Sequence, residues 1–152
     1  MRQKIVKIHA TAAIAALCMI TTFFASTLVS EIFGSYLIIS TVKTMILYAF
    51  WFVIPLMAIA GITGNKLASN AKGGIIGKKK KRMPFIAANG VLVLMPAAVY
   101  LESLASAGRF DTTFYIVQAI ELVAGFANIT LMSLNLMDGL SVSRKQKEKL
   151  QV

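Results

Sequence analysis

The chain has 152 residues, of which 57% are apolar, and its mean hydropathy is +0.74. This composition excludes a soluble globular domain of this size and makes a membrane protein the expected class. The single cysteine, Cys18, excludes an internal disulfide. The formal net charge of +10 is also typical of proteins that bind nucleic acid. Whether that applies here depends on where the charges lie along the chain.

A first apolar helix is predicted over about residues 9–30, after a short basic arm that holds Arg2, Lys4 and Lys7. The apolar run at its centre, from Ala10 to Val29, is about 30 Å long as a helix at roughly 1.5 Å per residue, enough to cross the hydrocarbon core of a bilayer. A secretory signal is the competing interpretation. The length of the run favours an uncleaved membrane helix.

Two further apolar helices are predicted over about residues 36–63 and 84–105. Pro55 and Pro96 are expected to kink them, because proline cannot donate the backbone hydrogen bond of a helix interior. Lys43 interrupts the first of the two and leaves its start open.

Between these helices the sequence is polar and contains glycine, and it predicts a basic loop over residues 65–83. A basic tail is likewise predicted over residues 138–152.

The fourth predicted helix, about residues 112–137, carries a stripe of polar and small residues. Their spacing of three and four is that of a packed helix seam, and the members are Gln118, Glu121, Gly125, Asn128, Met132 and Asn135. Hydrocarbon cannot satisfy a carboxyl or an amide, so the stripe is expected to face protein, water or a ligand. Asp111, Thr112 or Thr113 is expected to cap the start of this helix.

Basic residues are expected almost wholly on one side of the membrane. Fourteen of the sixteen Lys and Arg residues lie in the amino-terminal arm, the basic loop and the tail, and only Lys43 and Arg109 lie near the other side. This asymmetry predicts that both termini and the loop are cytoplasmic. It also accounts for the net charge without a nucleic acid, so none is expected as a partner. The predicted fold is an all-α membrane protein, an antiparallel four-helix transmembrane bundle in a single domain over residues 1–152.

Glu121 is the strongest candidate for a functional residue. A carboxyl about 13 Å inside a membrane span costs roughly 2.5–3.5 kcal/mol. If the second helix begins near Tyr36, Lys43 lies within reach, and an ion pair with Glu121 is expected, with hydrogen bonds from Gln118 and Tyr48. Such a pair either holds two helices together, which is the leading interpretation, or handles a proton, a cation or a ligand.

Further polar residues have simpler explanations beside functional ones. Asn89, Asn128 and Asn135 are expected to make hydrogen bonds between helices. His9 is either an interfacial side chain or an axial ligand of a haem b completed by a methionine. The basic run is either a topogenic signal or a contact for anionic lipid headgroups at the cytoplasmic face, and it comprises Lys78, Lys79, Lys80, Lys81 and Arg82. Solvated ion pairs are expected at the outer surface among Glu31, Glu102, Arg109 and Asp111.

Two motifs lie on the third and fourth predicted helices: Arg82-Met83-Pro84-Phe85-Ile86-Ala87-Ala88-Asn89-Gly90 and Phe114-Tyr115-x-Val117-Gln118-Ala119-x-Glu121-Leu122. These segments resemble a family of small four-span bacterial inner-membrane proteins of uncharacterised function. The resemblance covers most of the chain. It implies a multi-pass protein of the bacterial inner (cytoplasmic) membrane and implies nothing about a substrate.

The sequence thus favours a non-enzymatic integral inner-membrane protein that acts as a small structural or accessory component. It contains no catalytic triad, metal-ligand spacing or cofactor fingerprint, so no enzyme, no metal and, apart from the haem alternative, no cofactor are expected. One alternative is a proton-coupled small-molecule transporter or channel in which Glu121 titrates. Another is a haem-binding electron carrier that uses His9. The expected partners are membrane lipid and either a second copy of the chain or a larger membrane complex.

Overall fold

The computed structural model describes residues 2–68 and 73–148, with side chains up to residue 144, and every regular element within them is helical. The elements are α1 (Arg2–Phe33), α2 (Tyr36–Leu67), α3 (Gly74–Asn89), the π-helical turn η1 (Gly90–Leu94), α4 (Met95–Ser106) and α5 (Thr112–Glu148). α3, η1 and α4 follow one another without a break. The described chain therefore contains four helical segments long and apolar enough to cross a membrane, and this part of the sequence prediction is confirmed.

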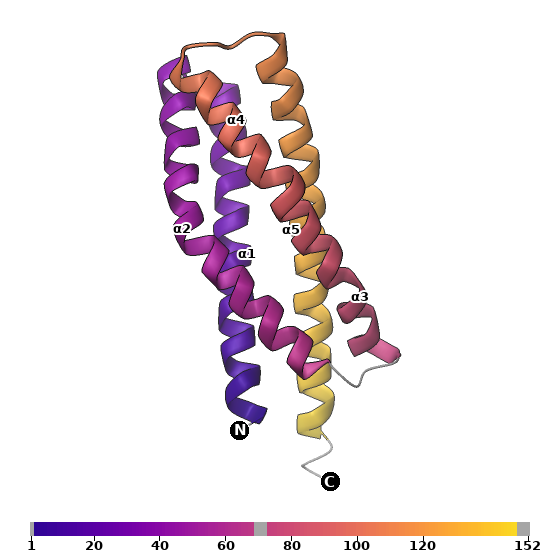
Figure 1. The fold of residues 1–152 in the computed structure, drawn as a ribbon. Coiled ribbons are helices and arrows are strands. Elements are labelled where there is room, and N and C mark those ends of the chain that lie inside the picture. The colour runs from indigo at the N-terminus through magenta and orange to yellow at the C-terminus, as the bar shows by residue number, and fades with distance from the viewer. Residues whose placement is uncertain (1, 69–72, 149–152) are drawn as a thin grey trace.

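The four segments stand side by side as a bundle (Figure 1). α1 rises in this view, α2 descends, α3 and α4 rise together, and α5 descends. α1 packs on α2 and α5, and the α3–α4 rod packs on the same two helices. Within the described residues, α2 and α5 do not approach each other closely and so lie diagonally across the bundle.

Short turns connect the segments at the upper end of Figure 1. α1 and α2 are separated only by Gly34 and Ser35. A Cβ at Gly34 would lie 2.5 Å from the carbonyl oxygen of Ser30, so glycine is required there. α4 ends in a Schellman-type turn at Gly108, whose φ of +68° suits glycine. Asp111 then accepts a hydrogen bond of 3.1 Å from the Phe114 N–H, which makes Asp111 the cap of α5 among the three candidates.

Several helix boundaries differ from the sequence prediction, beginning with α1, which starts at Arg2 instead of about residue 9. α2 extends to Leu67 and α3 begins at Gly74, so much of the stretch predicted as a loop over residues 65–83 is helical. α5 likewise runs to Glu148 through the predicted tail. Lysine and arginine are good helix formers, and Pro84 lies inside α3 instead of starting it. Residues 69–72 and 149–152 of the predicted loop and tail lie outside the described residues.

Two prolines shape the interior of the bundle. Pro55 lies in the middle of α2, and Figure 1 shows the lower half of this helix slanting away from the direction of its upper half. Pro96 follows η1, and because it has no N–H, the carbonyl of Leu92 loses its α-helical partner. The chain widens there, since the Met95 N–H bonds to the Gly90 carbonyl five residues back.

The buried apolar side chains form two clusters. One lies near the short turns and consists of Ile39, Leu101, Leu104, Ala105 and Phe114. The other lies farther down the bundle and consists of Ala16, Val53, Ile86 and Met132. Large apolar side chains also cover the outside, for example Trp51 at 80% and Leu37 at 77% exposure. An apolar exterior of this kind suits lipid as the surrounding solvent.

Candidate functional site

A lysine and a glutamate form an ion pair in the interior of the bundle. Lys43 on α2 is only 1% exposed, and its Nζ lies 2.5 Å from Oε2 of Glu121 on α5. The ion pair predicted from the sequence is therefore present. Because α2 and α5 lie diagonally across the bundle, these two side chains bridge its centre.

Gln118 supports this pair and Tyr48 does not. The Gln118 Nε2 donates a hydrogen bond of 3.1 Å to the same Oε2 of Glu121. Tyr48 is 67% exposed on the outside of α2, so its predicted role as a hydrogen-bond partner is wrong. It lies five residues after Lys43, and at about 100° per residue this turns its side chain roughly 140° away from that of Lys43.

Glu31 on α1 is a third charged neighbour of the pair. Its carboxyl interacts electrostatically with both Lys43 and Glu121. Within the described residues its Oε1 is buried without a hydrogen-bond partner. Glu31 was predicted to join solvated pairs at the outer surface. Among the described residues, the ion pair found there is the exposed Arg109–Asp111 pair at 3.0 Å. The turn between α1 and α2 has only two residues, and it brings Glu31 to the side of Lys43. The shortness of this turn was the sequence clue to their proximity.

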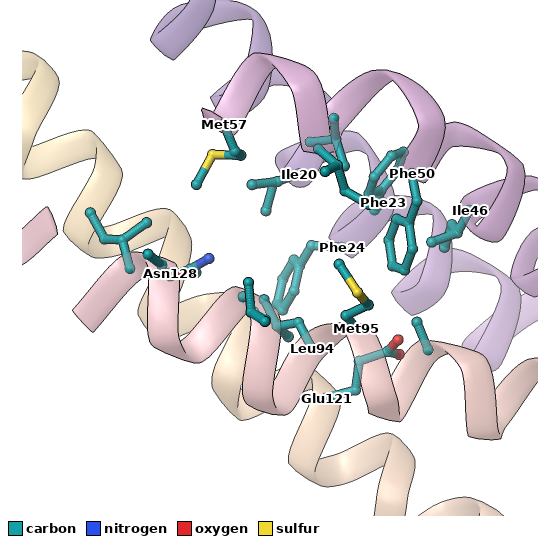
Figure 2. A pocket seen from close by; sticks show the side chains of 18 of the residues that line it. Ile20, Phe23, Phe24, Ile46, Phe50, Met57, Leu94, Met95, Glu121 and Asn128 are labelled. Carbon is teal, nitrogen blue, oxygen red and sulfur yellow. The ribbon is translucent and has the colours of Figure 1, made fainter. Parts of the chain in front are cut away.

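A cavity of about 470 Å³ extends from Glu121 along the bundle interior (Figure 2). Its wall is almost entirely apolar, with contributions from every helical segment. Phe23, Phe24, Phe50, Met57 and Met95 supply the bulk of this wall in Figure 2. The volume lies within the roughly 300–1,000 Å³ range of sites for small molecules.

Backbone irregularities and missing side chains make room for this cavity. The bend of α2 and the widened turn η1 both border it, as do Gly61, Gly90 and Gly125. A Cβ at Gly125 would come within 3.3 Å of the Phe24 ring. Ile62 and Val91 line the cavity and are also 71% and 56% exposed. The cavity therefore opens sideways between α2 and η1, toward the surroundings of the bundle.

Asn128 lies in the cavity wall with an unused acceptor. Its side chain is 1% exposed, and within the described residues its Oδ1 has no hydrogen-bond partner. Figure 2 shows its amide nitrogen, Nδ2, directed toward the cavity, so the unpartnered oxygen points away from it. Its predicted role in bonding two helices is therefore wrong for this oxygen. Asn89 does bond across helices, since its Nδ2 donates to the Ala124 carbonyl at 2.8 Å.

The basic run lies near the start of α3, where some of its side chains face α5 and others face outward. Arg82 forms an ion pair of 2.6 Å with Asp138 on α5 and donates a longer bond of 3.4 Å to Asn135. Lys79 also lies beside this part of α5, because its Nζ is near Gly139. Lys78 and Lys81 are exposed on the outside. Of these four residues, Lys78 and Lys81 are therefore the ones placed to contact lipid headgroups.

His9 joins α1 to α2. Its Nδ1 lies 3.0 Å from the Ala60 carbonyl oxygen and 3.2 Å from Thr63 Oγ1, and the residue is 9% exposed. His9 does not line the cavity. Its Cε1 and the Met83 thioether lie on the same side of Gly64, where a Cβ would meet both, so the methionine beside His9 is Met83. Among the described residues, no group of three His, Cys, Asp or Glu side chains is arranged to hold a metal ion.

The length and composition of the four helical segments, with charges confined to the interior and the ends, give the chain the architecture of a multi-pass integral membrane protein. No family model, no curated protein and no solved structure matches the sequence. The function must therefore be argued from the interior of the bundle.

Proposed function

We propose that this chain is a non-enzymatic, multi-pass protein of a bacterial inner membrane that binds a small, largely apolar molecule in its interior cavity, as a transporter or channel does. The single observation that carries the proposal is the Glu121 carboxylate in the wall of an apolar cavity open between α2 and η1. A carboxylate in hydrocarbon is costly, so its position beside a space of ligand size has a use beyond packing.

Energetics favours binding over a purely structural role for the ion pair. Desolvating Lys43 and Glu121 costs several kcal/mol per ion by typical values, and their attraction offsets this only in part. Apolar side chains of similar volume would join α2 and α5 about as well. The same placement allows a proton-coupled role. The two carboxylate oxygens of Glu121 can be occupied in turn by the Lys43 ammonium, a proton or a cationic ligand.

The topology we propose is an antiparallel four-span bundle with both termini in the cytoplasm. The excess of basic residues in the amino-terminal arm, the stretch before Pro84 and the tail supports this orientation. Anionic lipid headgroups then meet Lys78 and Lys81 at the cytoplasmic face. A second copy of the chain or a larger membrane complex remains compatible with the apolar exterior.

A structural or accessory component is the second candidate, and one observation favours it. Lys43 and Gln118 both donate to Oε2 of Glu121, so the carboxylate already has partners within the bundle. Under this alternative, the pair fixes the diagonal distance between α2 and α5 and the cavity stays unoccupied.

Occupancy of the cavity distinguishes the two candidates. The full chain is purified in mild detergent, and co-purifying small molecules are identified by mass spectrometry. We expect a molecule in near-stoichiometric amount in the wild type and its loss in Gly125→Leu, whose side chain extends into the cavity. Val123→Leu is the matched control, because Val123 is 72% exposed on the outside of the same helix. The same molecules in equal amounts from wild type and Gly125→Leu would contradict the proposal.

A further inference from the structure

The carboxylate of Glu121 offers the cavity an acceptor of hydrogen bonds. Lys43 and Gln118 occupy its Oε2, and within the described residues no hydrogen bond reaches its Oε1. Asn128 directs its amide nitrogen, a donor, toward the cavity, whereas its Oδ1 is fully buried. A ligand that satisfies Oε1 of Glu121 must donate a hydrogen bond. An unsatisfied acceptor in an apolar interior is costly, so such a ligand gains more than an apolar molecule of the same shape.

The charges that meet at Glu121 sum to one excess negative charge when all are ionised, and of these groups Glu121 is the one that lines the cavity. Glu31 on α1 and Glu121 on α5 are acidic, and Lys43 on α2 interacts with both. From α4, Glu102 accepts hydrogen bonds from Thr44 and Ser106 and is not among the charges that act on Glu31. α3 and η1 contribute no titratable side chain to the cavity wall. One added positive charge therefore balances the interior.

Aromatic rings complete the same chemistry. Phe23 and Phe50 pack with ring centroids 6.3 Å apart, and Phe24 lies on the neighbouring part of the wall. The faces of such rings attract cations in addition to apolar groups. Figure 2 shows these rings and the Glu121 carboxylate around one space.

From these three observations we propose that the cavity binds a lipophilic amine as its monocation. The ammonium group bonds to Oε1 of Glu121, and the apolar body lies against the phenylalanines. An acceptor on a longer ligand reaches the amide nitrogen of Asn128, which is two helical turns or about 10 Å along α5 from Glu121. The ligand passes from the bilayer through the opening beside Ile62 and Val91. This inference rests on the proposed function and narrows its substrate class.

Charge balance links the amine to a proton. In the empty protein, we place the balancing proton on Glu31, whose Oε1 is buried without a hydrogen-bond partner within the described residues. The arriving ammonium supplies the same charge, so the proton leaves as the amine binds. An exchange of this kind is the basis of proton-coupled transport.

Three probes with one apolar body test the inference: phenylbutylamine, phenylbutanol and phenylbutyrate. Each is titrated into the full chain in detergent by equilibrium dialysis, with empty micelles as the reference for partitioning. We expect the amine to bind at least about tenfold more tightly than the alcohol, and the carboxylate to bind most weakly. In weakly buffered solution, amine binding is expected to release close to one proton per chain.

Two variants assign the effect to residues. Glu121→Gln combined with Lys43→Met removes the wall carboxylate without leaving a buried unpaired charge, and it is expected to abolish the preference for the amine while the alcohol still binds. Glu31→Gln is expected to weaken the preference and suppress proton release. Val123→Leu should behave as the wild type.

The outcomes separate the two proposals. Equal binding of amine and alcohol to the wild type, or a preference that survives the double substitution, would overturn the amine assignment and leave a binding cavity. Unchanged preference in Glu31→Gln would overturn the charge balance that selects a monocation. If none of the three probes binds and no small molecule co-purifies with the wild type, both the amine assignment and the proposed function fail.

Discussion

Two ion pairs of nearly equal length lie in very different surroundings. Lys43–Glu121 spans 2.5 Å with side-chain exposures of 1% and 13%, whereas Arg82–Asp138 spans 2.6 Å with exposures of 25% and 27%. The first lies in the interior of the bundle and the second near the start of α3. Contact distance therefore says little about what either pair does. Desolvation governs the first pair and solvent screening governs the second.

The largest effect is expected from breaking the interior pair. Glu121→Gln leaves Lys43 charged and buried, which should lower the free energy of unfolding by about 3–5 kcal/mol. Adding Lys43→Met removes the orphaned charge and should recover most of that loss. Reversible unfolding in mixed micelles measures both variants against the wild type. A single substitution as stable as the double one would show that Lys43 reaches water, contrary to its burial.

The half-exposed pair should respond more weakly and to salt. Asp138→Asn is expected to lower the free energy of unfolding by about 1 kcal/mol at low ionic strength, because exposed pairs contribute at most this much. The difference should shrink at 1 M salt, where the Debye length falls to about 3 Å. The same unfolding assay at two salt concentrations checks this. If Asp138→Asn lowered the free energy of unfolding as much as Glu121→Gln does, and independently of salt, the two pairs would not differ in the way proposed.

Much of this contrast could be predicted from the sequence, because charge in an apolar helix allows few solutions. Lys43 and Glu121 are each the lone charge near their depth on their own helix, so their pairing follows from the requirement to neutralise both. Four apolar spans also follow from segment length alone. The predicted hydrogen bond from Tyr48 is absent because the prediction considered its hydroxyl group and not the direction in which its side chain leaves the helix.

The cavity could not be predicted in the same way. It depends on how α2 bends at Pro55 and how far the chain widens before Pro96, which are tertiary outcomes of packing. Asn128 has the same spacing signal as Gln118, yet the Gln118 Nε2 donates to Glu121 and the Asn128 nitrogen faces the cavity. Within the described residues the carbonyl oxygens of both side chains are buried without a partner. The helical state of the basic run does not follow from the sequence, because proline favours a helix start but is also tolerated inside a membrane-spanning helix, as Pro84 is in α3.

A bonded and an unbonded asparagine, Asn89 and Asn128, offer a further comparison with a smaller expected effect. Asn89→Ala should lower the free energy of unfolding by about 0.6 kcal/mol, the usual value of a hydrogen bond between membrane helices. Asn128→Ala should cost nothing or add stability, because it removes a buried acceptor without a partner. Thermal unfolding of both variants in the same detergent provides the comparison. Equal losses would mean that Asn128 is bonded in the apo protein.

The smallest effect is expected at the third, fully exposed pair, Arg109–Asp111. The Phe114 N–H, and after it the Arg109 side chain, hold the pKa of Asp111 below its ordinary value. Since the folded-state pKa is the lower one, this stabilisation is complete above the unfolded value of about 3.9 and is lost as the pH falls through the folded value. Asp111→Asn keeps a good helix cap but cannot titrate. We therefore expect near-wild-type stability at neutral pH and a shallower loss of helicity below about pH 4, followed by circular dichroism. An acid limb identical to the wild type would show that Asp111 does not cause it.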